Sequence, residues 1–175
     1  MSITLYVKKG SPGCTFTQSE PNLQDKDGNK FTIADVTAGN WIFYTLKDYN
    51  KDKGPHSYKR VMGVEKHVNI KDVNGSVFLV NPVDELILFE HFGYGGKSKR
   101  FGAKQKDLTD SFPPEGQGKS NVSSAILLSK DRSVVLFNGT DFAGNKQYTM
   151  QPGEWCEKLN VPGGLNDNCL SFKFI

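Results

Sequence analysis

Apolar and polar residues alternate over short segments along this chain, as they do in half-buried β-strands. In the first segment Ile3, Leu5 and Val7 alternate with polar neighbours. Eighteen Gly and eight Pro residues are spread along the sequence and indicate many turns. Short strands separated by turns favour an all-β fold with less than about 15% helix and no long helix.

A pattern of aromatic residues and glycine recurs in the C-terminal half. It consists of an aromatic residue, a second aromatic five positions later and a glycine two positions after that. A repeated pattern marks a structural module, so these aromatics are expected to pack the hairpins of one domain. The glycine is expected where a folded hairpin needs a positive φ or a close backbone approach. The complete pattern occurs as Phe89, Tyr94 and Gly96 and again as Phe137, Phe142 and Gly144.

The N-terminal half carries weaker copies of the same pattern. In the first copy Ser11 follows Tyr6 in place of the second aromatic. In the next copy Tyr44 and Tyr49 are kept, but Lys51 stands at the glycine position. The chain therefore contains four motifs, and each begins its pattern with what we term an opening aromatic.

The four motifs fall into two pairs, separated by the polar segment NPVDE at residues 81–85. Two motifs in each half favour paired Greek-key β-sandwiches over a single three-fold barrel. Inward-facing aromatic and aliphatic residues would fill the core of each sandwich. We therefore predict two domains, at residues 1–81 and 85–175, with the boundary near Pro82.

The composition is that of an ordinary globular protein, with 37% hydrophobic and 23% charged residues. No apolar segment reaches the length that a membrane-spanning helix requires. The start of the sequence lacks the features of a secretory signal, so we expect a cytoplasmic protein without a membrane partner. The three cysteines cannot all pair within the chain and are expected to be reduced. A net charge of +3 is too small to imply a polyanionic partner.

Three motifs that could indicate other functions fail on spacing or have a simpler explanation. The segment DKDGNK at 25–30 has Lys30 where a calcium loop of the EF-hand type requires glycine. The segment GGKS at 95–98 has His91 where a phosphate-binding loop requires glycine. Basic residues lie between tyrosines at 47–60, but a solvated hairpin face explains them as well as nucleic acid does. We therefore expect no nucleic-acid partner.

Catalysis is the least favoured class of function. The three histidines, His56, His67 and His91, lie in or beside expected loops and match no catalytic or zinc-binding pattern. A non-catalytic structural protein is the leading interpretation. The alternative is a binding module for carbohydrate or a protein partner, without metal, that uses loop aromatics. These aromatics would be Tyr49, Tyr58 and Trp155.

The aromatic and glycine pattern resembles the folded hairpin of the βγ-crystallin superfamily. The resemblance covers the whole chain and is strongest in the C-terminal half. It implies two Greek-key domains of two crystallin-type motifs each, in a two-domain, non-lens-type member. Each motif of the C-terminal half ends in a closing segment, which carries Ser120, Asn121 and Ser124 in one motif and Asp167, Asn168 and Ser171 in the other. These segments, rich in Asp and Asn, are similar to those of calcium-binding microbial and invertebrate members. The resemblance therefore implies a structural protein with weak calcium binding in the C-terminal domain.

The calcium mode of that family implies an exchange of ligands between the two motifs of a domain. An acid or amide loop from one motif pairs with a hydroxyl from the other, and hairpin carbonyls complete each site. These oxygen ligands suit calcium, which takes 6–8 of them. One implied site uses the Glu90 carbonyl, the Ser120–Asn121 loop and the Ser171 hydroxyl. The other uses the Asn138 carbonyl, the Asp167–Asn168 loop and the Ser124 hydroxyl.

The sequence also departs from the family pattern. Ala125 and Phe172 replace a final serine, and Ser120 replaces an acid or amide. Only Asp167 supplies a formal charge, so weak binding is expected. The alternative is that the closing segments form turns in which Asx and Ser side chains bond their own backbone. We expect the N-terminal domain to bind no calcium, and the protein to be a monomer or at most a weak homodimer.

Overall fold

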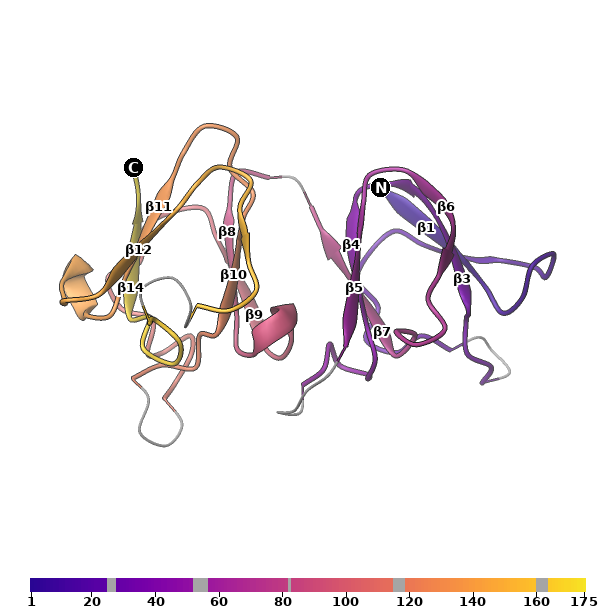
Figure 1. The fold of residues 1–175 in the computed structure, drawn as a ribbon, viewed down its shortest axis with the longest axis horizontal. Coiled ribbons are helices and arrows are strands. Elements are labelled where there is room, and N and C mark those ends of the chain that lie inside the picture. Colours follow the sequence, from indigo (N-terminus) through magenta and orange to yellow (C-terminus); the bar gives the residue numbers. More distant parts are fainter. Residues whose placement is uncertain (25–27, 52–56, 82, 115–118, 160–163) are drawn as a thin grey trace. The chain divides into compact units, whose positions relative to one another are not determined.

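The computed structural model describes residues 1–24, 28–51, 57–81, 83–114, 119–159 and 164–175. The chain forms two compact units, Met1–Pro82 and Val83–Ile175. Each unit consists of antiparallel strands, most of which are labelled in Figure 1. The described residues contain no α-helix, only two 3₁₀ turns of three residues each. The prediction of an all-β fold with two Greek-key β-sandwich domains is confirmed.

The N-terminal unit contains one four-stranded and one three-stranded sheet. The strand order is β2-β1-β3-β6 in the first sheet and β5-β4-β7 in the second. Both sheets bury one face in a common core around Trp41 and Phe43. Its strands are β1 (Ser2–Tyr6), β2 (Cys14–Phe16), β3 (Ile33–Ala38), β4 (Asn40–Tyr44), β5 (Tyr58–Met62), β6 (Glu65–Asn69) and β7 (Ser76–Val80).

The C-terminal unit repeats this arrangement. Its sheets have the orders β13-β10-β8-β9 and β12-β11-β14. They enclose a core that includes Leu88, Phe112, Leu136 and Phe172. Its elements are β8 (Leu86–Phe89), η1 (Phe92–Tyr94), β9 (Ser98–Phe101), β10 (Ser124–Leu127), β11 (Val134–Phe137), η2 (Thr140–Phe142), β12 (Gln147–Met150), β13 (Trp155–Cys156) and β14 (Ser171–Phe174).

The alternation seen in the sequence determines which face of a strand is buried. In β1 the side chains of Ile3 and Leu5 are fully buried, whereas Thr4 and Tyr6 on the opposite face are partly exposed. The strands of the C-terminal core are more uniformly apolar. All four residues of β8 and of β11 are buried, because both faces of these strands are covered.

Each unit exchanges a strand between its two motifs, as a Greek key requires. In the N-terminal unit β6 follows β4 and β5 in sequence but pairs with β3 of the other sheet. In the C-terminal unit β13 pairs with β10 in the same way. This crossing brings the closing segments of the two motifs of a unit close to each other.

The aromatic pattern shapes the hairpins as predicted. The Phe89 and Tyr94 rings pack edge to face with centroids 5.7 Å apart, and Phe137 and Phe142 are 6.2 Å apart. Phe142 is only half-buried, whereas the other three rings are buried. The pattern glycine of the fourth motif, Gly144, has a φ of +109°. A side chain there would also collide with Asn138, so the hairpin requires glycine.

No helix among the described residues is long and apolar enough to cross a membrane.

Candidate metal centre

The closing loops of the third and fourth motifs lie against each other in the C-terminal unit. The Asp167 carbonyl accepts hydrogen bonds from the backbone N–H groups of Lys119, at 2.7 Å, and Ser120, at 3.0 Å. The Asp167 N–H donates to the Val122 carbonyl at 3.0 Å. These bonds bring together two segments that both contain predicted ligands, the Ser120–Asn121 and Asp167–Asn168 loops.

A side-chain contact also links the two motifs at this point. The hydroxyl of Ser123, in the third motif, donates to Asp167 Oδ1, in the fourth, at 3.1 Å. Ser123 is buried, and its backbone N–H donates to the Phe89 carbonyl at 2.9 Å. Glu90 follows Phe89 directly, so the Glu90 backbone lies beside this pair. The contact therefore connects one hairpin to the acidic loop of the other motif.

A buried oxygen without a hydrogen-bond partner lies beside the same carboxylate. Asn166 Nδ2 donates to Asp167 Oδ2 at 2.9 Å, which leaves Asn166 Oδ1 as a buried acceptor. Within the described part of the chain, neither Asn166 Oδ1 nor the buried Ser120 Oγ has a partner. Buried polar atoms are usually paired with protein or water, so an unpaired one is a candidate to bind a water molecule or a cation. Hydroxyl, amide and carboxylate oxygens are the ligands that calcium takes.

The centre has little charge and no soft ligand. Asp167 is the only formally charged member among the predicted ligand side chains, because the predicted contribution of Glu90 is its carbonyl. The Glu90 carboxylate instead accepts the Lys97 N–H at 3.0 Å within its own hairpin. Burial raises the pKa of the neighbouring Cys169 to about 12, so its thiol stays protonated near neutral pH. Among the residues that the structure describes, no three His, Cys, Asp or Glu residues are grouped so that they could hold a metal ion together.

The hydroxyls of Ser124 and Ser171, both predicted ligands, lie within the hairpins of their own motifs. Ser124 Oγ donates to the His91 carbonyl at 2.6 Å and accepts the Tyr94 N–H at 3.1 Å. In the same way, Ser171 Oγ donates to the Gly139 carbonyl at 2.6 Å and accepts the Phe142 N–H at 3.0 Å. Each hydroxyl thus holds the second aromatic of its own motif, and one acceptor position remains on each oxygen.

The two motifs are related residue by residue, and this relation exposes an asymmetry. Ser123 and Leu170 are equivalent, because each donates its backbone N–H to the carbonyl of the opening aromatic, Phe89 or Phe137, at 2.9 Å. Counting back three residues makes Ser120 equivalent to Asp167. The counterpart of the Ser123–Asp167 pair is therefore Leu170 with Ser120, which has neither the exchanged hydroxyl nor the carboxylate.

The remaining predicted ligands form hydrogen bonds with residues near them in the sequence, or lie beside Ser120 of the Leu170–Ser120 pair. Asn138 Oδ1 accepts the Lys146 N–H at 3.0 Å, and its Nδ2 donates to Asn145. Asn168 Nδ2 donates to the Asn166 carbonyl at 2.9 Å. Asn121 is buried beside Ser120. Two residues of the centre, Ser123 and Asn166, were not among the predicted ligands, although each directly precedes a residue that was.

The aromatics proposed as a binding platform are largely used in packing. Tyr49 packs against Tyr44 and Phe78 with ring centroids 5.9 and 5.7 Å apart. Burial, followed by the nearby carboxylates of Glu20 and Asp48, raises the pKa of Tyr49. Trp155 lies in β13, packed against Tyr94 at 5.5 Å. Of the other sequence features, His56, Pro82 and residues 25–27 lie outside the described residues.

No protein-family model and no curated protein matches the sequence. Among solved structures, the chain is similar to geodin, a βγ-crystallin from Geodia cydonium. That match has a TM-score of 0.77 and 22% identity, over 98% of this chain and 97% of geodin. A βγ-crystallin from Ciona intestinalis matches with a TM-score of 0.42 and 27% identity, over 51% of this chain and 96% of its own. Protein S complexed with calcium matches with a TM-score of 0.36 and 14% identity, over 99% of both chains.

Proposed function

We propose that this protein is a non-enzymatic structural protein whose C-terminal unit binds calcium weakly. The chain has the two-domain βγ-crystallin fold that its aromatic and glycine pattern predicted. The observation that carries the proposal is the contact between Ser123 and Asp167. It joins two motifs beside Asn166 Oδ1, a buried acceptor that has no hydrogen-bond partner among the described residues. A calcium ion would bind this oxygen together with the Asp167 carboxylate.

The proposed ligands combine two predicted residues, one from each implied site, with two suggested by their contacts. The Asp167 carboxylate and the Glu90 carbonyl come from the prediction, and the Ser123 hydroxyl and the Asn166 amide oxygen are added because they lie at the same carboxylate. Calcium takes oxygen ligands of all these kinds, whereas thiophilic metals prefer thiolate. Ser124 and Ser171 support the site indirectly by holding the two hairpins. Asn121, Asn138 and Asn168 remain the candidates for a second, weaker position.

Weak affinity follows from the charge of the site. A single carboxylate offsets only part of the cost of removing water from a divalent cation. The remaining ligands are neutral oxygens, and water would complete the coordination. Binding in the millimolar to high micromolar range is the expected result, as in calcium modules that carry few charges.

The hydroxyls and thiols of this unit support a non-catalytic role. A serine nucleophile needs a base that accepts its proton, whereas Ser124 and Ser171 both donate to backbone carbonyls. Burial raises the pKa of Cys156 to about 11 and that of Cys169 to about 12. Thiols with such pKa values carry almost no thiolate near neutral pH and are poor nucleophiles.

The proposal is tested by calcium titration of the full chain, followed by calorimetry and thermal unfolding. Ligand that binds only the folded state stabilises it by about 2.7 kcal/mol at 100 times the dissociation constant. Asp167→Asn should abolish most of this gain, because asparagine keeps the size and accepts the positive φ of +53° but carries no charge. Asp131→Asn, at an exposed position in the same unit, is the matched control. If calcium stabilised Asp167→Asn and Asp131→Asn equally, the proposed site would be wrong.

A further inference from the structure

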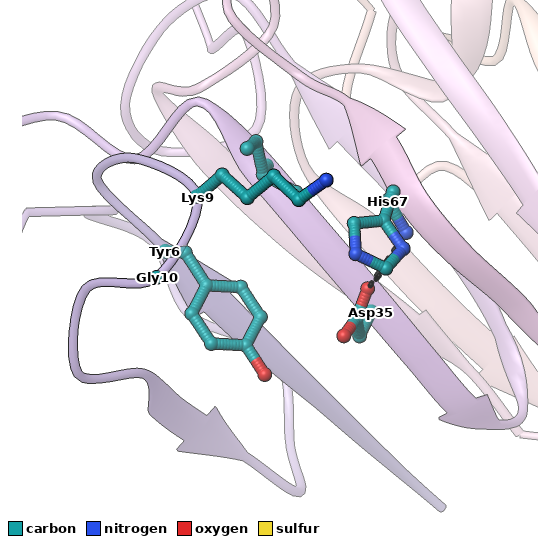
Figure 2. A pocket seen from close by; sticks show the side chains of 6 residues that line it. Tyr6, Lys9, Gly10, Asp35 and His67 are labelled. Atoms are coloured by element: carbon teal, nitrogen blue, oxygen red, sulfur yellow. Dashed lines mark hydrogen bonds and ion pairs between the residues drawn. The ribbon is translucent and has the colours of Figure 1, made fainter.

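A hollow of about 310 Å³ lies on the N-terminal four-stranded sheet, on the face opposite Ile3 and Leu5. Figure 2 shows the side chains around it, which come from β1, the following turn, β3 and β6. The lining residues are Tyr6, Lys9, Gly10, Ile33, Asp35 and His67.

The hollow lies where the first motif lacks the second aromatic of the repeat. In the other three motifs that ring packs on the opening aromatic. The ring pairs are Tyr44–Tyr49 at 5.9 Å, Phe89–Tyr94 at 5.7 Å and Phe137–Phe142 at 6.2 Å. In the first motif the second position is Ser11, whose hydroxyl donates to the Lys8 carbonyl at 2.8 Å. No second ring of the motif therefore covers Tyr6.

The serine that holds the second aromatic is also replaced in the first motif. Ser76, Ser124 and Ser171 each lie opposite the opening aromatic in the paired strand. Each accepts the N–H of the second aromatic. Opposite Tyr6 the equivalent residue is Ile33, which has no hydroxyl. The ring and its holding serine are therefore absent together, and Ile33 becomes part of the lining instead.

The strand register identifies which residue of the first motif's sheet stands where Trp155 stands in the C-terminal unit. Ala34 pairs with Val68 as Ala125 pairs with Cys156, so His67 occupies the position of Trp155. In the C-terminal unit the Tyr94 ring lies between Phe89 and Trp155, at 5.7 and 5.5 Å. The hollow in the N-terminal unit is the corresponding space between Tyr6 and His67. It is thus a place for a six-membered ring that the first motif does not fill.

The polar groups around this space are held in position. The β3–β6 register shifts between Ala34 and Val36, at a bulge that contains Asp35. Asp35 Oδ1 accepts the backbone N–H of His67 at 2.6 Å, and His67 has a φ of +56°. β-bulges commonly redirect a side chain next to a functional site. Figure 2 shows the Lys9 amine and the Asp35 carboxylate both directed toward His67, with the Tyr6 ring beside Asp35.

We propose that this hollow binds a pyranose sugar. The Tyr6 ring and Ile33 offer apolar surface for the C–H face of a sugar ring. The Asp35 carboxylate accepts hydrogen bonds from hydroxyls, and the Lys9 ammonium and His67 imidazole donate to them. A neutral polyol fits both charges, whereas Asp35 opposes a simple anion and Lys9 opposes a simple cation. The site lies in the N-terminal unit and is independent of the calcium proposal.

The test uses the full chain and a panel of methyl glycosides of glucose, galactose, mannose and N-acetylglucosamine, measured by saturation-transfer NMR and calorimetry. At least one glycoside should bind with a millimolar or tighter dissociation constant. A glycan array distinguishes a free monosaccharide from the terminal residue of a longer glycan. No binding at tens of millimolar, or binding only of phenol or of a free amino acid, would overturn the proposal.

Three variants and one control locate the binding. Lys9→Gln and Asp35→Asn each remove one charged hydrogen-bonding partner and should weaken binding about tenfold. Asparagine retains an acceptor for the His67 N–H, so the bulge is preserved. Ser11→Tyr restores the second aromatic and should exclude the sugar by occupying its place. Lys71→Gln, an exposed lysine of the same unit that does not line the hollow, should leave affinity unchanged. Equal affinity in all four variants would overturn the assignment, whatever their stability.

Discussion

Ser123 and Asp167 belong to different motifs, and the hydroxyl of the first donates to the carboxylate of the second at 3.1 Å. Backbone bonds from Lys119 and Ser120 to the Asp167 carbonyl hold the same two loops together. Bonds between the two motifs therefore hold these loops together at the proposed calcium site. A calcium ion placed there would stabilise the pairing of the motifs as well as the loops.

Ser123→Ala should reduce the calcium-dependent rise in melting temperature and leave the calcium-free protein nearly as stable as the wild type. Removing this hydroxyl takes away one proposed ligand and one hydrogen bond, whose net contribution to folding is about 1 kcal/mol. Ser124→Ala is the matched comparison at the adjacent position. It should destabilise the protein with and without calcium, because the Tyr94 N–H loses its acceptor. Thermal unfolding with calcium and with chelator separates the two effects, and the reverse pattern would assign Ser124 as the ligand.

Phe137→Ala should lower the free energy of unfolding of the C-terminal unit by about 3–5 kcal/mol, the range for truncation of a buried phenylalanine. The ring is 7% exposed and packs on Phe142. Phe142→Ala should cost clearly less, because that ring is half-buried. Urea denaturation followed by fluorescence measures both. Equal losses would show that the second aromatic contributes as much as the first.

The hairpin core could be predicted from the sequence because its spacing is local. Phe89, Tyr94 and Gly96 lie within one hairpin, so their pattern alone describes their packing. For the proposed calcium ligands, the sequence pattern leaves the choice between adjacent residues open. Adjacent strand residues point to opposite faces, and spacing cannot show that Ser123 faces Asp167 while Ser124 faces its own hairpin.

The hollow in the N-terminal unit could not be predicted from spacing at all. The sequence shows that Ser11 replaces an aromatic, which is a local difference. That Asp35 and His67 line the resulting space depends on the pairing of β3 with β6 and on the bulge between Ala34 and Val36. Pairing between distant segments is set by the tertiary fold, and the sequence pattern does not contain it.

The stability of the C-terminal unit should fall as the pH rises above about 9. Burial raises the pKa of Cys169 from its ordinary value of 9.0 to about 12. The unfolded thiol therefore loses its proton first, and stability is lost progressively between these two values. Cys169→Ala removes this titration, so its free energy of unfolding should decrease less between pH 8 and pH 10.5 than that of the wild type. Cys14→Ala, at a partly exposed thiol in the other unit, is the control. Parallel curves for Cys169→Ala and the wild type would show that the thiol is accessible in the folded state.

A second calcium site should arise when the two motifs are made chemically equal. Leu170 and Ser120 occupy the positions of Ser123 and Asp167, so Leu170→Ser combined with Ser120→Asp would reproduce the exchanged pair on the other side. Ser120 is fully buried, and a carboxylate there is costly without a partner. The calcium-free double variant should therefore be less stable than the wild type, and calcium should restore more stability than it adds to the wild type. Calorimetry should then show one more calcium ion per chain than the wild type binds under the same conditions. The Ser120→Asp single variant controls for charge alone, because it lacks the exchanged hydroxyl. An unchanged stoichiometry in the double variant, with no larger gain from calcium, would show that the equivalence of the two motifs does not extend to metal binding.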